Sequence, residues 1–254
     1  MPLPRTPSFR LDGRRALVTG ASRGIGLAAA AALAEVGADV TLVARNAVEV
    51  EAAAREIVAA GGNAQALALD VTEFHAVAAA IASAAPFDVF VNNAGTNRPK
   101  PFIEVTPEDF DLVMGLNVRA AFFAAQAVAR RLIEAGRPGS IINMSSQMGH
   151  VGGSNRTVYC SSKHALEGMT KAMAVELGSN GIRVNTLCPT FIETPMTQPY
   201  LEEPGFASLV TSKIKLGRLG QVEDLMGAFV FLASDASALM TGTAVVVDGG
   251  WTAD

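Results

Sequence analysis

The chain has 254 residues, half of them hydrophobic, which is enough to bury the core of one large domain or two small ones. Its 20 basic and 24 acidic side chains give a formal net charge of −4, without the basic excess expected of a nucleic-acid-binding protein. No run of about eighteen apolar residues is free of charges or helix breakers, and residues 1–15 lack an apolar signal core, so we expect a cytoplasmic protein without membrane contact.

Three prolines, Pro2, Pro4 and Pro7, predict a loose N-terminal tail over residues 1–12, followed by a single domain over residues 13–254. Short apolar runs then alternate with longer helical stretches, a pattern typical of parallel strands joined by right-handed crossovers. The predicted strands are Ala16–Thr19, Val40–Val43, Ala64–Leu69, Val89–Val91, Ser140–Met144, Arg183–Leu187 and Ala244–Val247. The predicted helices are Ile25–Val36, Val48–Ala60, Val77–Ala84, Val118–Glu134, Val158–Leu177 and Val222–Leu232. We therefore predict an α/β Rossmann fold with a doubly wound, seven-stranded parallel sheet.

A glycine-rich turn joins the first strand to the first helix. Gly20, Gly24 and Gly26 follow the spacing Gly-x-x-x-Gly-x-Gly, and Ser22, Arg23 and Ile25 lie between or beside them. Glycines let the backbone turn sharply and approach a pyrophosphate, and the helix N-terminus offers free amides. Tight turns need glycine for backbone reasons alone, but the position after a first strand favours a dinucleotide site.

The end of the second strand bears on the choice of cofactor. An enzyme selective for NAD would place an acid here to bind the ribose 2′-hydroxyl, but the stretch reads LVARN, with no carboxylate. Arg45 and Arg23 could instead clamp a 2′-phosphate, so NADP(H) is favoured and NAD(H) stays possible. Either arginine could also be an ordinary solvated surface charge.

Tyr159 and Lys163 are one helical turn apart, and Ser146 precedes the tyrosine by thirteen positions. Such a trio can move a proton, because a nearby ammonium stabilises a phenolate and lowers a phenol's pKa by roughly 1–3 units from about 10. Pairs of this kind also occur by chance on exposed helix faces.

These motifs together resemble the classical short-chain dehydrogenase/reductase family over nearly the whole chain. The matching residues, in order, are Thr19-Gly20-x-x-x-Gly24-x-Gly26, Asn92-Asn93-Ala94-Gly95, Asn117, Ser146, Tyr159-x-x-x-Lys163 and the stretch Pro189 to Thr194. The resemblance implies the strand order 3-2-1-4-5-6-7 and an NADP(H)-dependent enzyme that interconverts a carbonyl and a secondary alcohol.

The resemblance also implies roles for individual residues. In the reductive direction Ser146 would bind the carbonyl oxygen, Tyr159 would protonate it, and Lys163 would favour the phenolate and bind the nicotinamide ribose. Asn117 would bend its helix and hold a water that links Lys163 to solvent. The remaining cofactor positions are Asp70 and Val71 at the adenine, Asn93, Ala94 and Gly95 along the channel, and Pro189, Ile192 and Thr194 near the carboxamide. Asp70 could equally be a helix N-terminal acid, and Thr190 replaces the family's usual glycine after Pro189.

The substrate is predicted less sharply. The family arrangement suggests that the pocket is lined by Arg98, Gln147, His150, Asn155 and Arg156, a polar and cationic set that suits a sugar acid or polyol, as in gluconate 5-dehydrogenase-like members. Each of them could instead be a solvated loop residue. Residues 195–216, interrupted by Pro199, Pro204 and Gly205, are expected to form an irregular, mobile lid.

Two alternatives stay open. The family's 3-oxoacyl-[acyl-carrier-protein] reductases dock their carrier on two basic positions; Arg137 matches one, but Asn180 stands at the other. A nucleotide-sensing protein without catalysis is disfavoured because all four catalytic positions are present. We further expect a homotetramer paired through 118–134 and 158–177, no metal site, and two buried thiols, Cys160 and Cys188, without a disulfide.

Overall fold

A computed structural model describes residues 3–253 and contains one seven-stranded parallel sheet in the order β3-β2-β1-β4-β5-β6-β7. The predicted fold class and strand order are therefore confirmed, and each predicted strand lies within two residues of the observed one. The strands are β1 (Arg15–Thr19), β2 (Asp39–Ala44), β3 (Asn63–Ala68), β4 (Val89–Asn92), β5 (Gly139–Met144), β6 (Ile182–Pro189) and β7 (Ala244–Val247).

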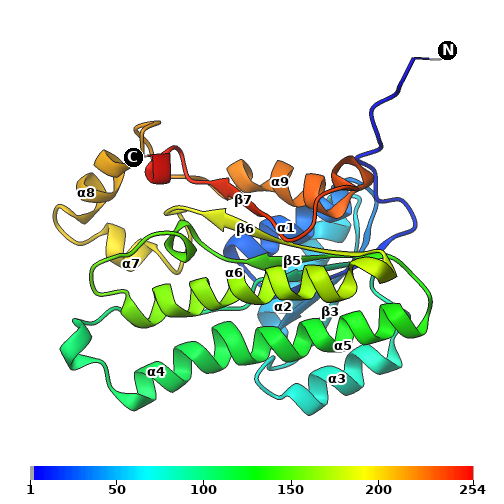
Figure 1. Ribbon diagram of the computed structural model, residues 1–254, viewed down its shortest axis with the longest axis horizontal. Helices are drawn as coiled ribbons and strands as arrows, with labels where there is room; N and C mark the ends of the chain where they lie inside the picture. Colours follow the sequence, from blue (N-terminus) through cyan, green and yellow to red (C-terminus); the bar gives the residue numbers. More distant parts are fainter. Residues whose placement is uncertain (1–2, 254) are drawn as a thin grey trace.

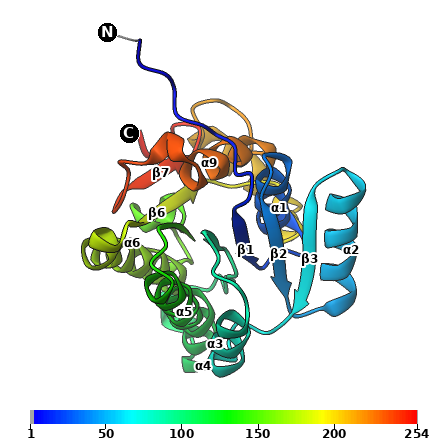
Figure 2. The ribbon, with the colours of Figure 1, turned by 90° about the vertical axis from the view of Figure 1, so that its right-hand side faces the viewer.

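Helices cover both faces of the sheet, as Figures 1 and 2 show. One buried cluster joins the sheet to α1, α2 and α9, and a second joins its other face to α3, α5 and α6. The helices are α1 (Gly24–Glu35), α2 (Ala47–Ala59), α3 (Phe74–Ser83), α4 (Pro107–Met114), α5 (Ala121–Glu134), α6 (Thr157–Leu177), α7 (Gln198–Leu201), α8 (Phe206–Lys213) and α9 (Glu223–Ala233). Because both faces are covered, the strands are apolar throughout rather than alternating.

The helix predicted over 118–134 begins eleven residues earlier, at Pro107. Thr106 caps it, with Asp109 completing a capping box, and a π-helical stretch, Gly115–Ala120, links α4 to α5. Pro107–Glu134 is the one helix among residues 3–253 long and apolar enough to cross a membrane. Its inner side packs against α3 and the sheet, as expected of a core helix.

Two segments differ from expectation. Residues 195–216 were predicted to be irregular, which is wrong, because they contain α7 and α8. Pro199 lies in the first turn of α7, where its missing N–H costs nothing, and Gly205 precedes α8 at φ 80°. In the N-terminal stretch Leu11 is fully buried and its amide donates to Val36 O at 2.8 Å, so this stretch is anchored before Gly13.

Candidate active site

A cavity of about 900 Å³ lies at the carboxyl ends of the central strands, where a doubly wound sheet binds its ligand. It brings together every residue predicted to contact the cofactor: Gly20, Ser22, Arg23, Gly24, Ile25, Gly26, Arg45, Asp70, Val71, Asn93, Ala94, Gly95, Tyr159, Lys163, Pro189, Ile192 and Thr194. Segments that are far apart in sequence thus converge on one site.

Neighbouring atoms lie so close to the glycines of the turn that side chains would not fit there. A Cβ on Gly26 would lie 2.2 Å from Gly20 O, and one on Gly20 would lie 3.0 Å from Ala94 Cα. Asn93 Nδ2 braces the turn by donating to Thr19 O at 2.9 Å and Gly20 O at 3.1 Å. Within the described part of the chain no side chain caps the start of α1, so its first amides are available to an anion. This cradle fits a dinucleotide pyrophosphate.

At the ribose end of the cavity, the structure adds a carboxylate that the sequence analysis missed. Arg23 and Arg45 both line the cavity and are exposed. Glu49, in the first turn of α2, lies beside them and accepts from Ser22 Oγ at 3.2 Å and Asn46 Nδ2 at 3.0 Å. No carboxylate lies at the end of β2 itself; the acid comes from the helix that follows.

Asp70, predicted at the adenine, lines the same cavity. Its Oδ1 accepts from the amide and the hydroxyl of Thr72, at 2.9 and 2.8 Å. Although partial burial raises the pKa of Asp70, these hydrogen bonds and the charge of Arg45 outweigh it, and the net pKa is below the usual value. Asp70 is therefore an anion at neutral pH.

Ser146, Tyr159 and Lys163 meet in the cavity from two elements. Ser146 follows the end of β5, and Tyr159 and Lys163 lie on consecutive turns of α6. Ser146 Oγ donates to Gln147 Oε1 at 2.6 Å and accepts from Met148 N at 3.1 Å. Lys163 Nζ donates to Met144 O at 2.7 Å, which fixes the ammonium at the end of β5.

The expected lowering of the tyrosine pKa is wrong for this structure. Burial raises the pKa of Tyr159 to about 12, against the opposing effects of the Ser146 hydroxyl and the Arg156 charge. Burial also lowers the pKa of Lys163 to about 8. Tyr159 and Lys163 do lie one turn apart on α6, but desolvation of both groups dominates over their mutual attraction. Tyr159 therefore holds its proton at neutral pH.

Asn117 lies behind this trio rather than on the cavity wall. It sits in the π-helical stretch and is 1% exposed. Its Oδ1 accepts from Thr96 N at 2.8 Å, and its Nδ2 donates to Thr96 O at 2.9 Å and Ser162 Oγ at 3.0 Å. The expected distortion of the helix is thus present, and Asn117 ties it to α6.

Of the residues suggested for the substrate, only Arg98 lines the cavity. Gln147 is buried and holds Ser146, while Arg156 is buried with its guanidinium 5.1 Å from the centre of the Tyr200 ring. Asn155 occupies a left-handed conformation at φ 59°, and its carbonyl accepts from Lys100 N at 3.1 Å. His150 instead contacts Cys188 and Glu167, neither of which lines the cavity.

Several buried polar atoms near the cavity have no hydrogen-bond partner among residues 3–253. They are Asn97 Oδ1, Ser145 Oγ, Gln147 Nε2, Arg156 Nη1 and Thr190 Oγ1. Buried polar groups are almost always paired, so such a group of orphans marks a place where a polar ligand or water completes the bonding. Asn97 and Thr190 line the cavity themselves and were not singled out from the sequence as substrate contacts.

A family model described as enoyl-(acyl carrier protein) reductase matches residues 20–252. L-xylulose reductase from Bos taurus is 43% identical over 245 residues, which cover 96% of this chain and 99% of that protein. Gluconate 5-dehydrogenase from Gluconobacter oxydans is 41% identical over 248 residues, 96% of each chain. A crystal structure of gluconate 5-dehydrogenase from Burkholderia cenocepacia, in complex with NADP and tartrate, superposes with a TM-score of 0.93 at 38% identity, covering 97% of this chain and 98% of that one.

Proposed function

Because this chain belongs to the short-chain dehydrogenase/reductase family, we propose that it interconverts a ketone and a secondary alcohol on a small polyhydroxylated substrate, using NADP(H). The family makes the chain an oxidoreductase. The observation that supports the substrate class is the group of unpartnered buried polar atoms beside Ser146 and Tyr159.

The residues present fit NADP(H). Gly20, Gly24 and Gly26 would hold the pyrophosphate against the start of α1, and Arg23 and Arg45 would face the 2′-phosphate. When bound, NADPH supplies the hydride that reduces the carbonyl carbon. The relative from Burkholderia cenocepacia, crystallised with NADP, supports the choice of cofactor.

The chain's own residues would handle the oxygen and its proton. Ser146 Oγ is positioned by Gln147 and Met148, and its single proton, which Gln147 Oε1 accepts in this structure, would turn to the substrate oxygen, where negative charge grows. Tyr159 carries a proton at neutral pH and would transfer it to that oxygen. The Lys163 cation would stabilise the resulting phenolate. Asn117 links the π-helical stretch to α6 by donating to Ser162 Oγ.

The unpartnered polar atoms of the cavity match the hydrogen-bonding groups of a hydroxylated substrate, which supports the substrate class. Among the atoms without a partner, Asn97 Oδ1 is an acceptor and Thr190 Oγ1 is a hydroxyl, and both residues line the cavity. The hydroxyls of a sugar or polyol can both donate and accept, so one hydroxylated ligand could satisfy both atoms, whereas an apolar ketone would leave them unpaired. The named activities of the relatives, on xylulose and gluconate, agree with this class.

A lid, a homotetramer and a cytoplasmic location also belong to the proposal. Tyr200 and Met196 reach the cavity from residues 195–216, which supports a lid that closes over the substrate. A homotetramer paired through the long helix Pro107–Glu134 is supported by three exposed phenylalanines on that helix, Phe110, Phe122 and Phe123. A cytoplasmic location is supported by the two free thiols.

A panel of NADPH-dependent reductions tests the proposal. We expect hydroxylated ketones, such as xylulose and 5-ketogluconate, to give a kcat/KM at least tenfold above that of cyclic ketones without hydroxyls, the size expected when buried polar groups would otherwise be left unpaired. Preference for a 3-oxoacyl thioester would favour the acyl-carrier alternative, which is weakened because Arg137 already pairs with Asp88 at 2.6 Å. NADPH binding without turnover on any carbonyl would favour a nucleotide sensor.

A further inference from the structure

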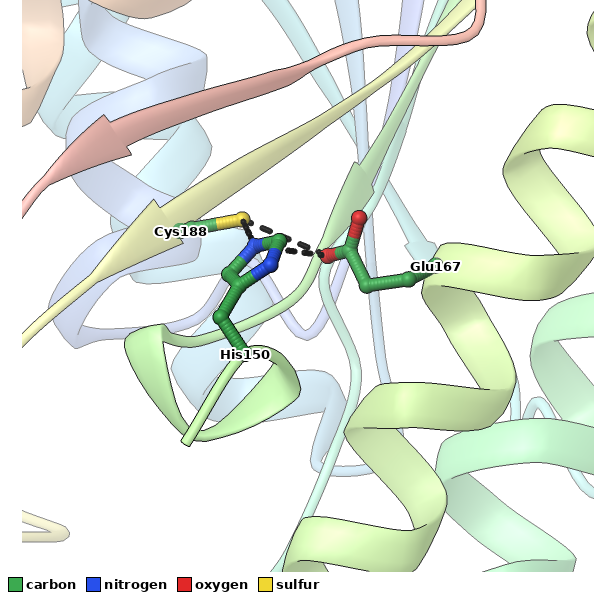
Figure 3. Close-up of side chains that lie close together, drawn as sticks. All are labelled: His150, Glu167 and Cys188. Atoms are coloured by element: carbon green, nitrogen blue, oxygen red, sulfur yellow. Dashed lines mark hydrogen bonds and ion pairs between the residues drawn. The ribbon is translucent and has the colours of Figure 1, made fainter. Parts of the chain in front are cut away.

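Three side chains that the proposed reaction does not use converge on one point, as Figure 3 shows. His150 lies just after the 3-10 turn Gln147–Gly149, Glu167 lies on α6 and Cys188 lies on β6. The Cys188 Sγ is 3.4 Å from His150 Nε2 and 3.3 Å from Glu167 Oε1, and the same two histidine and glutamate atoms are 3.6 Å apart.

These distances match one face of a zinc tetrahedron. With bonds of about 2.0–2.1 Å to nitrogen and oxygen and about 2.3 Å to sulfur, tetrahedral angles separate the three donor atoms by about 3.4–3.6 Å. The observed separations lie within a few tenths of an ångström of these values. An imidazole, a carboxylate and a thiol are also the ligand types that zinc prefers.

The surroundings hold two of the three donors in place. Glu167 and Cys188 are buried, and Thr186 Oγ1 donates to the second carboxylate oxygen of Glu167 at 3.0 Å. Hydrogen bonds of this kind orient the ligands of metal sites. The His150 side chain is 34% exposed, which leaves a path for an ion and room for a water as a fourth ligand.

We propose that His150, Glu167 and Cys188 form a zinc site. Binding would release the Cys188 thiol proton to solvent and form a Zn–S bond, with no change in the oxidation state of either atom. Zn²⁺ would neutralise the thiolate and carboxylate charges and bind a neutral histidine. The site lies outside the substrate cavity and does not depend on the proposed function.

Its position indicates a structural role. Glu167 is one helical turn beyond Lys163, Cys188 directly precedes Pro189, and His150 follows Ser146 by four residues. Zinc would therefore join the three segments that carry the active site. His150 and Cys188 are 38 positions apart, so no local spacing in the sequence signals the site.

The test is titration of the chelator-treated full-length protein with Zn²⁺, followed by calorimetry and thermal unfolding, and with Co²⁺, followed by absorption. We expect one zinc per chain, a rise in Tm that a chelator reverses, and a thiolate-to-cobalt charge-transfer band. Cys188→Ser, Glu167→Gln and His150→Asn should each remove these signals. Cys160→Ser and His164→Asn are matched controls on the same helix and should retain them.

Thr186→Val provides a graded test, because it leaves all three donors in place and removes only the supporting contacts of Thr186 Oγ1, which donates to Glu167 and accepts from Cys188 Sγ; it should weaken zinc binding by about 10–100-fold. Since His150 is partly exposed, His150→Asn should fold, which circular dichroism would verify. Absence of zinc binding to the wild-type protein, or equal binding by the folded His150→Asn variant, would overturn the proposal and leave a purely hydrogen-bonded cluster.

Discussion

The Lys163 Nζ lies 5.4 Å from the centre of the Tyr159 ring, and burial favours the neutral form of both groups. It raises the pKa of Tyr159 to about 12 and lowers the pKa of Lys163 to about 8. The tyrosine keeps its proton at every physiological pH. The lysine changes charge near pH 8. The electrostatic support for proton transfer therefore depends on Lys163.

The rate of carbonyl reduction should fall as the pH rises through about 8. Below its pKa Lys163 is a cation and stabilises the developing phenolate; above it this charge is lost, while Tyr159, with a pKa of about 12, stays protonated. Initial rates of NADPH oxidation between pH 6.5 and 9.5, at saturating cofactor, measure this. A flat profile across this range would contradict the assignment.

Tyr159→Phe should abolish reduction, lowering kcat by at least about 100-fold, because it removes the transferable proton and little else. NADPH affinity should change less than about threefold, since the cradle at Gly20 to Gly26 is untouched. Fluorescence titration with NADPH provides the control. Retained turnover would show that another group supplies the proton.

Ala44→Asp combined with Arg45→Gln should swing cofactor preference toward NADH. The change places an acid where a ribose 2′-hydroxyl would lie and removes one of two cations facing the 2′-phosphate. We expect the NADPH-to-NADH ratio of kcat/KM to fall at least about tenfold, or 1.4 kcal/mol. An unchanged ratio would mean that residues other than Ala44 and Arg45 set the preference between NADPH and NADH.

Glu49→Gln should act in the opposite direction. The Glu49 carboxylate accepts from Ser22 and Asn46 and lines the cavity with Arg23 and Arg45, so it would repel a 2′-phosphate bound there. Removing its charge should lower the KM for NADPH about twofold to fivefold, the scale of a charge interaction worth up to about 1 kcal/mol near the surface. The KM for NADH is the internal control, and a parallel change in both would point to altered loop structure instead.

Gly26→Ala should lower the free energy of unfolding by about 1–3 kcal/mol and weaken NADPH binding, because the new Cβ would meet Gly20 O. Gly227→Ala is the matched control. Gly227 also lies in a helix, α9, but a Cβ there meets no atom within 4 Å, so the variant should gain about 0.5–1 kcal/mol. Urea unfolding measures the free energy of unfolding of both variants. Equal values would show that the close contact with Gly20 O does not require glycine at position 26.

The sequence by itself determined the class of the fold and the location of the cofactor cradle. Apolar runs such as Val89–Val91 encode buried parallel strands, and the Gly20–Gly26 turn encodes backbone geometry that few other residues allow. These signals are local, so they can be read along the chain. The strand order came from family resemblance, since local patterns do not say which strands pair.

Tertiary structure decided what depends on contacts between distant segments. The pKa of Tyr159 is set by burial within the folded site, which outweighs the i, i+4 lysine that the sequence displays. Glu49 enters the ribose site from α2, and His150 joins Glu167 and Cys188 only after three elements pack together. Desolvation and the meeting of distant side chains arise only when the folded atoms pack together. The spacing of residues along the chain therefore reveals neither of them.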